Sequence, residues 1–90
     1  MLEATLKIVN PLGLHARAAA QLVKLAGQFK SDIKLLRTDN MVIADAKSIL
    51  SVLTLAAGKG VELKLTVEGA DEEEAFQAIK GIFENGFGEI

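Results

Sequence analysis

The chain has 90 residues with a formal net charge of −2, and half of its residues are hydrophobic. A domain of this size hides only about 60–65% of the surface that its unfolded chain exposes, so a deep enzyme cleft is not expected. Acidic and basic residues are interleaved and aromatic residues are few, which excludes the electrostatic footprint and stacking surface of a nucleic-acid-binding protein. The absence of cysteine excludes disulfides and cysteine-based zinc sites. We predict a single domain over residues 1–90, without a metal or a cofactor.

The first residues do not resemble an export signal. They alternate between apolar and polar and lack a basic segment followed by a continuous apolar run. No segment approaches the roughly 20 apolar residues that span a bilayer. We expect a soluble, cytoplasmic protein that does not insert into a membrane.

The first predicted strand covers residues 2–9, where apolar and polar side chains alternate. Asn10, Pro11 and Gly13 interrupt it, so residues 10–14 are predicted to form a loop. From residue 16 the apolar spacing becomes helical, up to a last turn near residue 27. His15 therefore lies between the loop and the first helix.

The middle of the chain is predicted to form a hairpin, a short helix and a strand. Residues 33–35 and 41–44 are typical of extended segments, and the turn-forming residues 38–40 join them. Apolar residues between Asp45 and Leu55 fall at helical spacing until residues 56–60 break the pattern. Residues 61–67 alternate strictly and predict the clearest strand of the chain.

The last predicted helix begins at Asp71. Asp71 with Glu74 three residues later fits a capping box, and Glu72 and Glu73 place negative charge where the helix dipole is positive. The Asn-Gly pair at residues 85–86 is expected to end this helix. The order strand, helix, strand, strand, helix, strand, helix predicts an α+β fold with one four-stranded, mostly antiparallel sheet and three helices on one face.

His15 is the strongest candidate for chemistry. The first amides of a helix, here those of Ala16, Arg17 and Ala18, have no intrahelical partners and carry partial positive charge, so an anion on the imidazole would find donors there. The guanidinium of Arg17 suits phosphate oxygens. The same positive surroundings disfavour the imidazolium and keep a lone pair for attack on phosphorus. The alternative is a capping or solvated histidine without function.

The string Gly13-Leu14-His15-Ala16-Arg17, together with the element order, resembles the HPr family of phosphocarrier proteins of the bacterial phosphoenolpyruvate-dependent phosphotransferase system. The resemblance extends through residues 46–50, 58–60 and 68–73, so it covers essentially the whole chain. It implies an open-faced β-sandwich, phosphorylation of His15 at Nδ1, and Arg17 as the partner of the phosphate. It also implies a carrier rather than an enzyme, which accepts the phosphoryl group from enzyme I and passes it to EIIA-type proteins.

Two positions depart from the family pattern. Ala18 stands where the family usually has proline. Because alanine is a strong helix former, we expect the anion-binding helix start at residues 16–18 to be retained, with a more mobile entry into the helix. Leu12 replaces the polar residue of some members, so any side-chain hydrogen bond there is lost. Residues 10–13, 35–40 and 83–87 also resemble the nitrogen-branch proteins called NPr. Sugar uptake and nitrogen-type regulation therefore both stay open, with a slight preference for the nitrogen type or a general carrier.

Ser48, between Lys47 and Ile49, resembles the regulatory serine that HPr kinase/phosphorylase modifies in some members of the family. A phosphate there would present about −1.5 to −2 charge to any partner that docks over the second helix. The alternative is a purely structural residue at the start of a helix.

Partner proteins are expected to dock on the surface around His15, where the first two helices meet. The residues of this expected surface are Ala20, Gln21, Lys24, Lys47, Ile49 and Leu50. Leu53 also borders it, but a core position is the favoured expectation for this residue. We expect the carrier to act as a monomer.

Two other functional classes compete with the carrier. A regulatory module of the same fold would recognise a partner through its apolar rim alone, as in serine-only relatives, but the presence of His15 and Arg17 argues against it. An independent enzyme has little support because no second nucleophile, base or metal cluster accompanies the histidine, and helix capping already explains residues 72–74.

Overall fold

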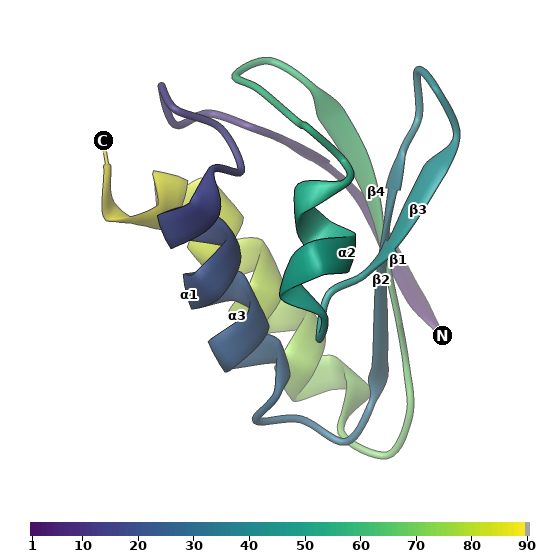
Figure 1. The fold of residues 1–90 in the computed structure, drawn as a ribbon. Helices are drawn as coiled ribbons and strands as arrows, with labels where there is room; N and C mark the ends of the chain where they lie inside the picture. The colour runs from purple at the N-terminus through teal and green to yellow at the C-terminus, as the bar shows by residue number, and fades with distance from the viewer. Residues whose placement is uncertain (90) are drawn as a thin grey trace.

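The computed structural model describes residues 1–89, so residue 90 of the predicted domain lies outside the described residues. The elements follow the predicted order (Figure 1). They are β1 (Leu2–Lys7), α1 (Ala16–Ala26), β2 (Asp32–Arg37), β3 (Val42–Asp45), α2 (Ile49–Leu53), β4 (Glu62–Glu68), α3 (Glu72–Glu84) and the 3-10 turn η1 (Gly86–Gly88). Across the described part of the chain, every helix is too short or too polar to cross a membrane.

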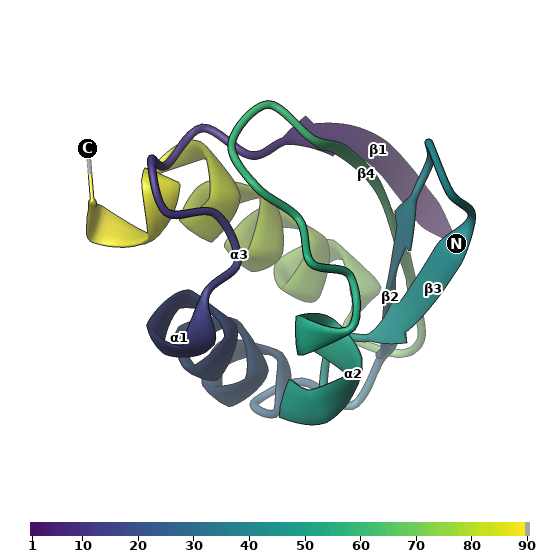
Figure 2. The ribbon, with the colours of Figure 1, turned by 45° about the horizontal axis from the view of Figure 1, so that its top comes forward.

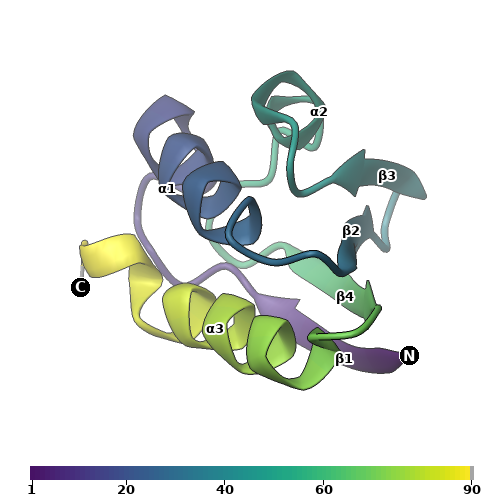
Figure 3. The same ribbon diagram turned by 90° about the horizontal axis from the view of Figure 1, so that it is seen from below.

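The four strands form one sheet in the order β1-β4-β2-β3, and all neighbouring strands are antiparallel. In the central strand β4, Leu65 lies opposite Ala4 of β1 and Leu35 of β2. Leu63, Leu65 and Val67 are buried and alternate with residues that face the other side. All three α-helices cover the same face of the sheet (Figures 1 and 3). The predicted α+β fold is therefore confirmed.

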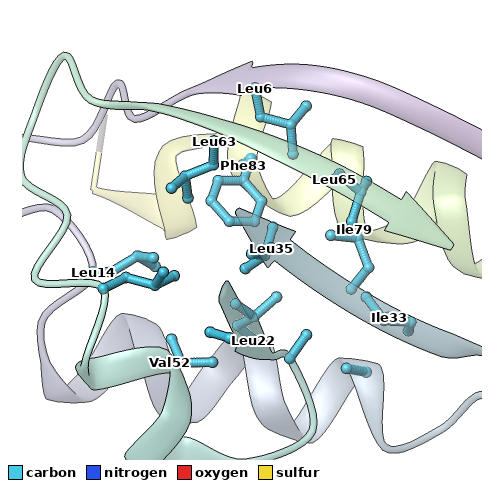
Figure 4. Packing of buried hydrophobic residues seen from close by; sticks show 14 of the residues in the cluster. Leu6, Leu14, Leu22, Ile33, Leu35, Val52, Leu63, Leu65, Ile79 and Phe83 are labelled. Atoms are coloured by element: carbon cyan, nitrogen blue, oxygen red, sulfur yellow. The ribbon is translucent and has the colours of Figure 1, made fainter. Parts of the chain in front are cut away.

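The hydrophobic core lies between this sheet face and the helices. Leu22 of α1 and Phe83 of α3 meet the inward side chains of β2 and β4, among them Leu35 and Leu65 (Figure 4). Full burial of such a side chain stabilises the fold by roughly 1.5–3 kcal/mol. Alternate residues of each strand point into this layer, and the other face of the sheet has no helical cover because all three α-helices lie on one side.

Most predicted boundaries shift by one or two residues, but the second helix, predicted between Asp45 and Leu55, covers only Ile49–Leu53. β1 ends at Lys7 instead of residue 9, although Ile8 still exchanges backbone hydrogen bonds with Gly60 and Val61. α2 is limited to five residues.

The predicted capping box at Asp71 is wrong. Asp71 does occupy the N-cap of α3, but its carboxylate makes no hydrogen bond to that helix. It accepts hydrogen bonds from the backbone N–H groups of Lys30 and Ser31, both at 2.9 Å, and from the Ser31 hydroxyl. These bonds, led by the one from the hydroxyl, lower the pKa of Asp71 to about 2. A tertiary contact with the turn after α1 has therefore replaced the local cap.

The reach-back contact at the start of α3 is made by Glu72. Its Oε1 accepts a hydrogen bond from the Gly69 N–H at 3.1 Å, and this bond is the first cause of its lowered pKa. Glu74, the predicted partner, is exposed. The acidic first turn still complements the positive end of the helix dipole.

Candidate functional site

His15 occupies the N-cap of α1, at the junction of loop and helix. Its carbonyl accepts a hydrogen bond from the Ala19 N–H at 2.8 Å, while its side chain makes no capping hydrogen bond. Consequently, the amides of Ala16, Arg17 and Ala18 have no acceptor within residues 1–89. Three donors at the positive end of a helix thus lie beside the imidazole, an arrangement that suits an anion.

The loop before α1 is held by Asn10 and Gly13. Asn10 is fully buried, and its Nδ2 donates a hydrogen bond to the Gly13 carbonyl at 2.9 Å. Gly13 has a φ of +66°, and a Cβ at this position would lie 2.5 Å from the carbonyl oxygen of Ala57. The same oxygen accepts a hydrogen bond from the Leu14 N–H at 2.9 Å. The motif needs glycine here because both the backbone conformation and the space exclude a side chain.

Glu89 contacts His15 and was not expected from the sequence. Its Oε2 pairs with Nε2 of His15, and its Oε1 accepts a hydrogen bond from Asn10 Nδ2 at 3.1 Å. The side chains of His15 and Glu89 are 24% and 14% exposed. The hydrogen bonds from His15 and Asn10 hold the pKa of the Glu89 carboxyl below its usual value. The predicted positive neighbours of the imidazole are therefore not its only charged neighbours, because Glu89 adds a carboxylate that favours the imidazolium.

The segment after α3 brings Glu89 to this position. The predicted helix end is confirmed, with Asn85 at the C-cap of α3. Gly86, Phe87 and Gly88 then have φ values of 60°, 54° and 78° and reverse the chain. Phe87 is buried and packs edge-to-face on Phe83, with ring centroids 5.0 Å apart. This turn lies beside the loop that precedes α1 (Figures 1 and 2).

Arg17 is exposed and lines a hollow of about 550 Å³ together with Gln21, Leu12 and Glu89. Among the side chains of residues 1–89, no carboxylate forms an ion pair with its guanidinium. Nor does this part of the chain bring three metal-ligating side chains together. The charges of the site therefore come from Arg17, Glu89 and the helix end.

Ser48 lies at the N-cap of α2, where its hydroxyl oxygen accepts a hydrogen bond from the Ser51 N–H at 3.3 Å. Its structural role at a helix start is therefore confirmed, while its phosphorylation stays a prediction. The neighbouring Lys47 donates a hydrogen bond from Nζ to the Phe29 carbonyl at 2.7 Å. This contact links the turn before α2 to the segment after α1.

Apolar side chains are exposed on the loop before His15 and on α2. Leu50 is 75% exposed and Leu12 is 64% exposed. The expected core position of Leu53 is wrong, since this residue is 37% exposed. α2 has only five residues, so it buries one side, and Val52 occupies that side. The exposed positions that α1 and α2 add to this surface are Ala20, Gln21, Lys24 and Ile49.

Comparisons with known proteins agree on one family. The family model described as "PTS HPr component phosphorylation site" matches residues 2–85. The phosphocarrier protein HPr of Cupriavidus necator is 48% identical over 89 residues, covering 99% of this chain and 98% of the relative. The crystal structure of HPr-C-His from Thermoanaerobacter tengcongensis superimposes with a TM-score of 0.93 and 41% identity, covering 100% of this chain and 99% of the other. An HPr dimer from the same organism has a TM-score of 0.77 and 42% identity, with coverage of 99% and 100%. The chain therefore belongs to the HPr family of phosphocarrier proteins of the phosphotransferase system.

Proposed function

We propose that His15 accepts a phosphoryl group on Nδ1 and passes it to a partner protein, with Arg17 and the amides of residues 16–18 binding the phosphate. The observation that carries this proposal is the position of a part-exposed imidazole directly before helix amides that lack acceptors. Such amides stabilise a bound anion because they are donors at the positive end of the helix dipole.

The transfer step needs only an available nitrogen lone pair and groups that bind the phosphoryl oxygens. The lone pair of Nδ1 attacks phosphorus, the bond between phosphorus and the donor atom breaks, and its electron pair leaves with the donor. The helix amides and the guanidinium of Arg17 stabilise the charge on the phosphoryl oxygens. Glu89 lies at Nε2, the other ring nitrogen, so it leaves the side of Nδ1 open.

Family membership supports phosphorylated enzyme I as the donor and EIIA-type proteins as the acceptors. Both must reach the same imidazole, so they dock in turn on one surface. Leu12, Ile49, Leu50 and Leu53 supply exposed apolar area there, which suits small, transient interfaces. Leu50→Ala should slow transfer at low partner concentration but leave thermal stability unchanged, since most of this side chain is already in water.

Ser48 is proposed as a regulatory phosphorylation site for a kinase of the HPr kinase/phosphorylase type. A phosphate on its hydroxyl would add negative charge beside Ile49 and Leu50, at the centre of the docking surface. Desolvating this charge during docking costs free energy, so phosphorylation of Ser48 should weaken the encounter with enzyme I.

The test of the main proposal is phosphorylation by phosphoenolpyruvate and enzyme I of a relative, followed by mapping of the phosphate under alkaline conditions by mass spectrometry. We expect one phosphate on His15 and none on the His15→Ala variant. Arg17→Ala should accept the group more slowly, and Lys30→Ala, which removes an exposed cation elsewhere, should behave as wild type. Phosphate on another residue, or normal acceptance by His15→Ala, would contradict the assignment.

The same assay separates the remaining alternatives. A pure binding module would remain unphosphorylated yet still bind a partner, whereas onward transfer to a sugar-type or a nitrogen-type EIIA protein would identify the branch. We propose a monomeric carrier, and light scattering of the full chain tests this point against the dimer found for one relative.

A further inference from the structure

We propose that Glu89 is a positioning residue that fixes the Nε2–H tautomer of His15 and so keeps the reactive lone pair on Nδ1. The inference rests on the proposed function of His15. It assigns a role in the transfer reaction to a residue that lies outside the Gly13–Arg17 motif.

Asn10 determines what the Glu89 side chain must present. Asn10 Nδ2 donates to the Gly13 carbonyl at 2.9 Å and to Glu89 Oε1 at 3.1 Å. The Gly13 carbonyl can only accept a hydrogen bond, so the amide nitrogen must face it, and the orientation of Asn10 is thereby fixed. Asn10 Oδ1 is buried without a partner, a cost that is tolerated because the two donated bonds hold the amide in place. Glu89 must therefore offer an acceptor at Oε1.

The second carboxylate oxygen then determines the tautomer of His15. Oε2 contacts Nε2, and an ionised carboxylate can only accept hydrogen bonds, so Nε2 carries the proton. The lowered pKa of Glu89 agrees with an ionised carboxylate. A neutral imidazole has a single N–H, which leaves the lone pair on Nδ1. Because the His15 side chain makes no capping hydrogen bond to α1, this lone pair is not used by the helix.

The same contact suits the phosphorylated product. When Nδ1 forms its bond to phosphorus and Nε2 keeps its proton, the ring carries a positive charge, and no proton has to leave during the step. The Glu89 carboxylate lies against this charge and stabilises it. Arg17 lines the same hollow as Glu89, and its guanidinium stabilises the negative charge of the phosphoryl oxygens. The two charged side chains thus act on different parts of one phosphoimidazole.

Glu89→Gln provides a sharp test, because glutamine offers one acceptor and one donor where glutamate offers two acceptors. If the glutamine oxygen faces Asn10, its NH2 group faces Nε2 and favours the Nδ1–H tautomer, which blocks the reactive nitrogen. In the opposite orientation, two donors meet at Asn10, which its bond to Gly13 prevents from turning. Glu89→Gln should therefore stabilise the Nδ1–H tautomer of His15, while Glu89→Ala should give a mixture of the Nδ1–H and Nε2–H tautomers.

The tautomer can be measured by nitrogen NMR of ring-labelled histidine, and the spectra are simple because the chain has one histidine. In alkaline buffer, wild type should show the Nε2–H form alone. Glu84→Gln, which removes an exposed carboxylate at the end of α3, is the matched control and should give the wild-type spectrum. Identical spectra for wild type, Glu89→Ala and Glu89→Gln would overturn the inference. Amide spectra of each variant establish that the fold is retained.

Phosphoryl acceptance supplies the second readout. The initial rate should fall roughly 3- to 10-fold in Glu89→Ala, the effect of one net hydrogen bond, and further in Glu89→Gln. Altered tautomers with unchanged rates would refute a positioning role. If the phosphate maps to His15 but the Glu89 variants leave the tautomer unaltered, this inference is refuted and the proposed function stands. If the phosphate maps to another residue, the proposed function is refuted whatever the spectra show.

Discussion

Substitution of Gly13 by alanine tests how firmly the loop before His15 is held. Gly13 has a φ of +66°, a conformation that costs an L-residue about 1–2 kcal/mol. The added Cβ would also lie 2.5 Å from the Ala57 oxygen and 2.8 Å from Gly58 Cα. Both neighbours are backbone atoms, so relief requires movement of the chain, which typically costs about 1–3 kcal/mol.

The two costs together predict a loss of about 2–5 kcal/mol in unfolding free energy, out of the 5–15 kcal/mol that is usual for a small domain. For a chain of this length the corresponding fall in Tm is roughly 10–40 °C. Urea unfolding followed by far-UV circular dichroism measures the free energy directly, and the method suits a protein that has no tryptophan. The amide signals of residues 10–17 should also shift, because the loop that carries His15 is displaced.

Gly60→Ala is the matched control. Gly60 has a φ of +90°, but a Cβ there would meet nothing within 4 Å. This variant should lose only the conformational part, about 1–2 kcal/mol. Equal losses in the two variants, within about 0.5 kcal/mol, would refute the view that Gly13 is required by the close approach of residues 57–58.

Three further predictions concern stability around the site. Asp71→Asn should be less stable than wild type at neutral pH. Folding lowers the pKa of Asp71 from 3.8 to about 2, so the stabilisation by the ionised carboxylate is complete above the unfolded pKa and is lost as the pH falls towards about 2. The unfolding free energies of the two proteins, measured by urea titration, should therefore converge over that range, and a constant difference would contradict this. Ser48→Ala should cost about 1 kcal/mol through loss of the N-cap, whereas Ser48→Asp keeps a capping oxygen, and slower transfer in that variant would then reflect docking rather than unfolding. Phe87→Ala should lower the unfolding free energy by up to about 3–5 kcal/mol, as for other buried phenylalanines. It should also let the pKa of Glu89 rise towards its usual value in a carboxyl NMR titration. An unchanged pKa would show that Phe87 does not hold the turn after α3.

The order and type of the elements could be predicted because each depends on a local period. The alternation in residues 61–67 predicts a strand whose one face is buried, and β4 buries that face with Leu63, Leu65 and Val67. The position of His15 at a helix start likewise follows from the breakers before it and the helical spacing after it. Its assignment as the phosphoryl acceptor, by contrast, depends on the resemblance of Gly13–Arg17 to the HPr family, since a lone histidine at a helix start has no single meaning.

The tertiary structure decided the contacts between segments that are distant in the chain. Asp71 fits a local cap in sequence, yet it bonds to the turn after α1, about forty residues away, because that turn packs against the start of α3. Leu53 follows the helical apolar pattern but stays partly in water, since a single short turn of helix covers little of the core. Glu89 meets His15 across 74 residues only because the turn after α3 folds back and Phe87 is anchored on Phe83. Local patterns report which side of an element is buried, but the partner on that side, and the charge it brings to an active residue, depend on how the elements pack together.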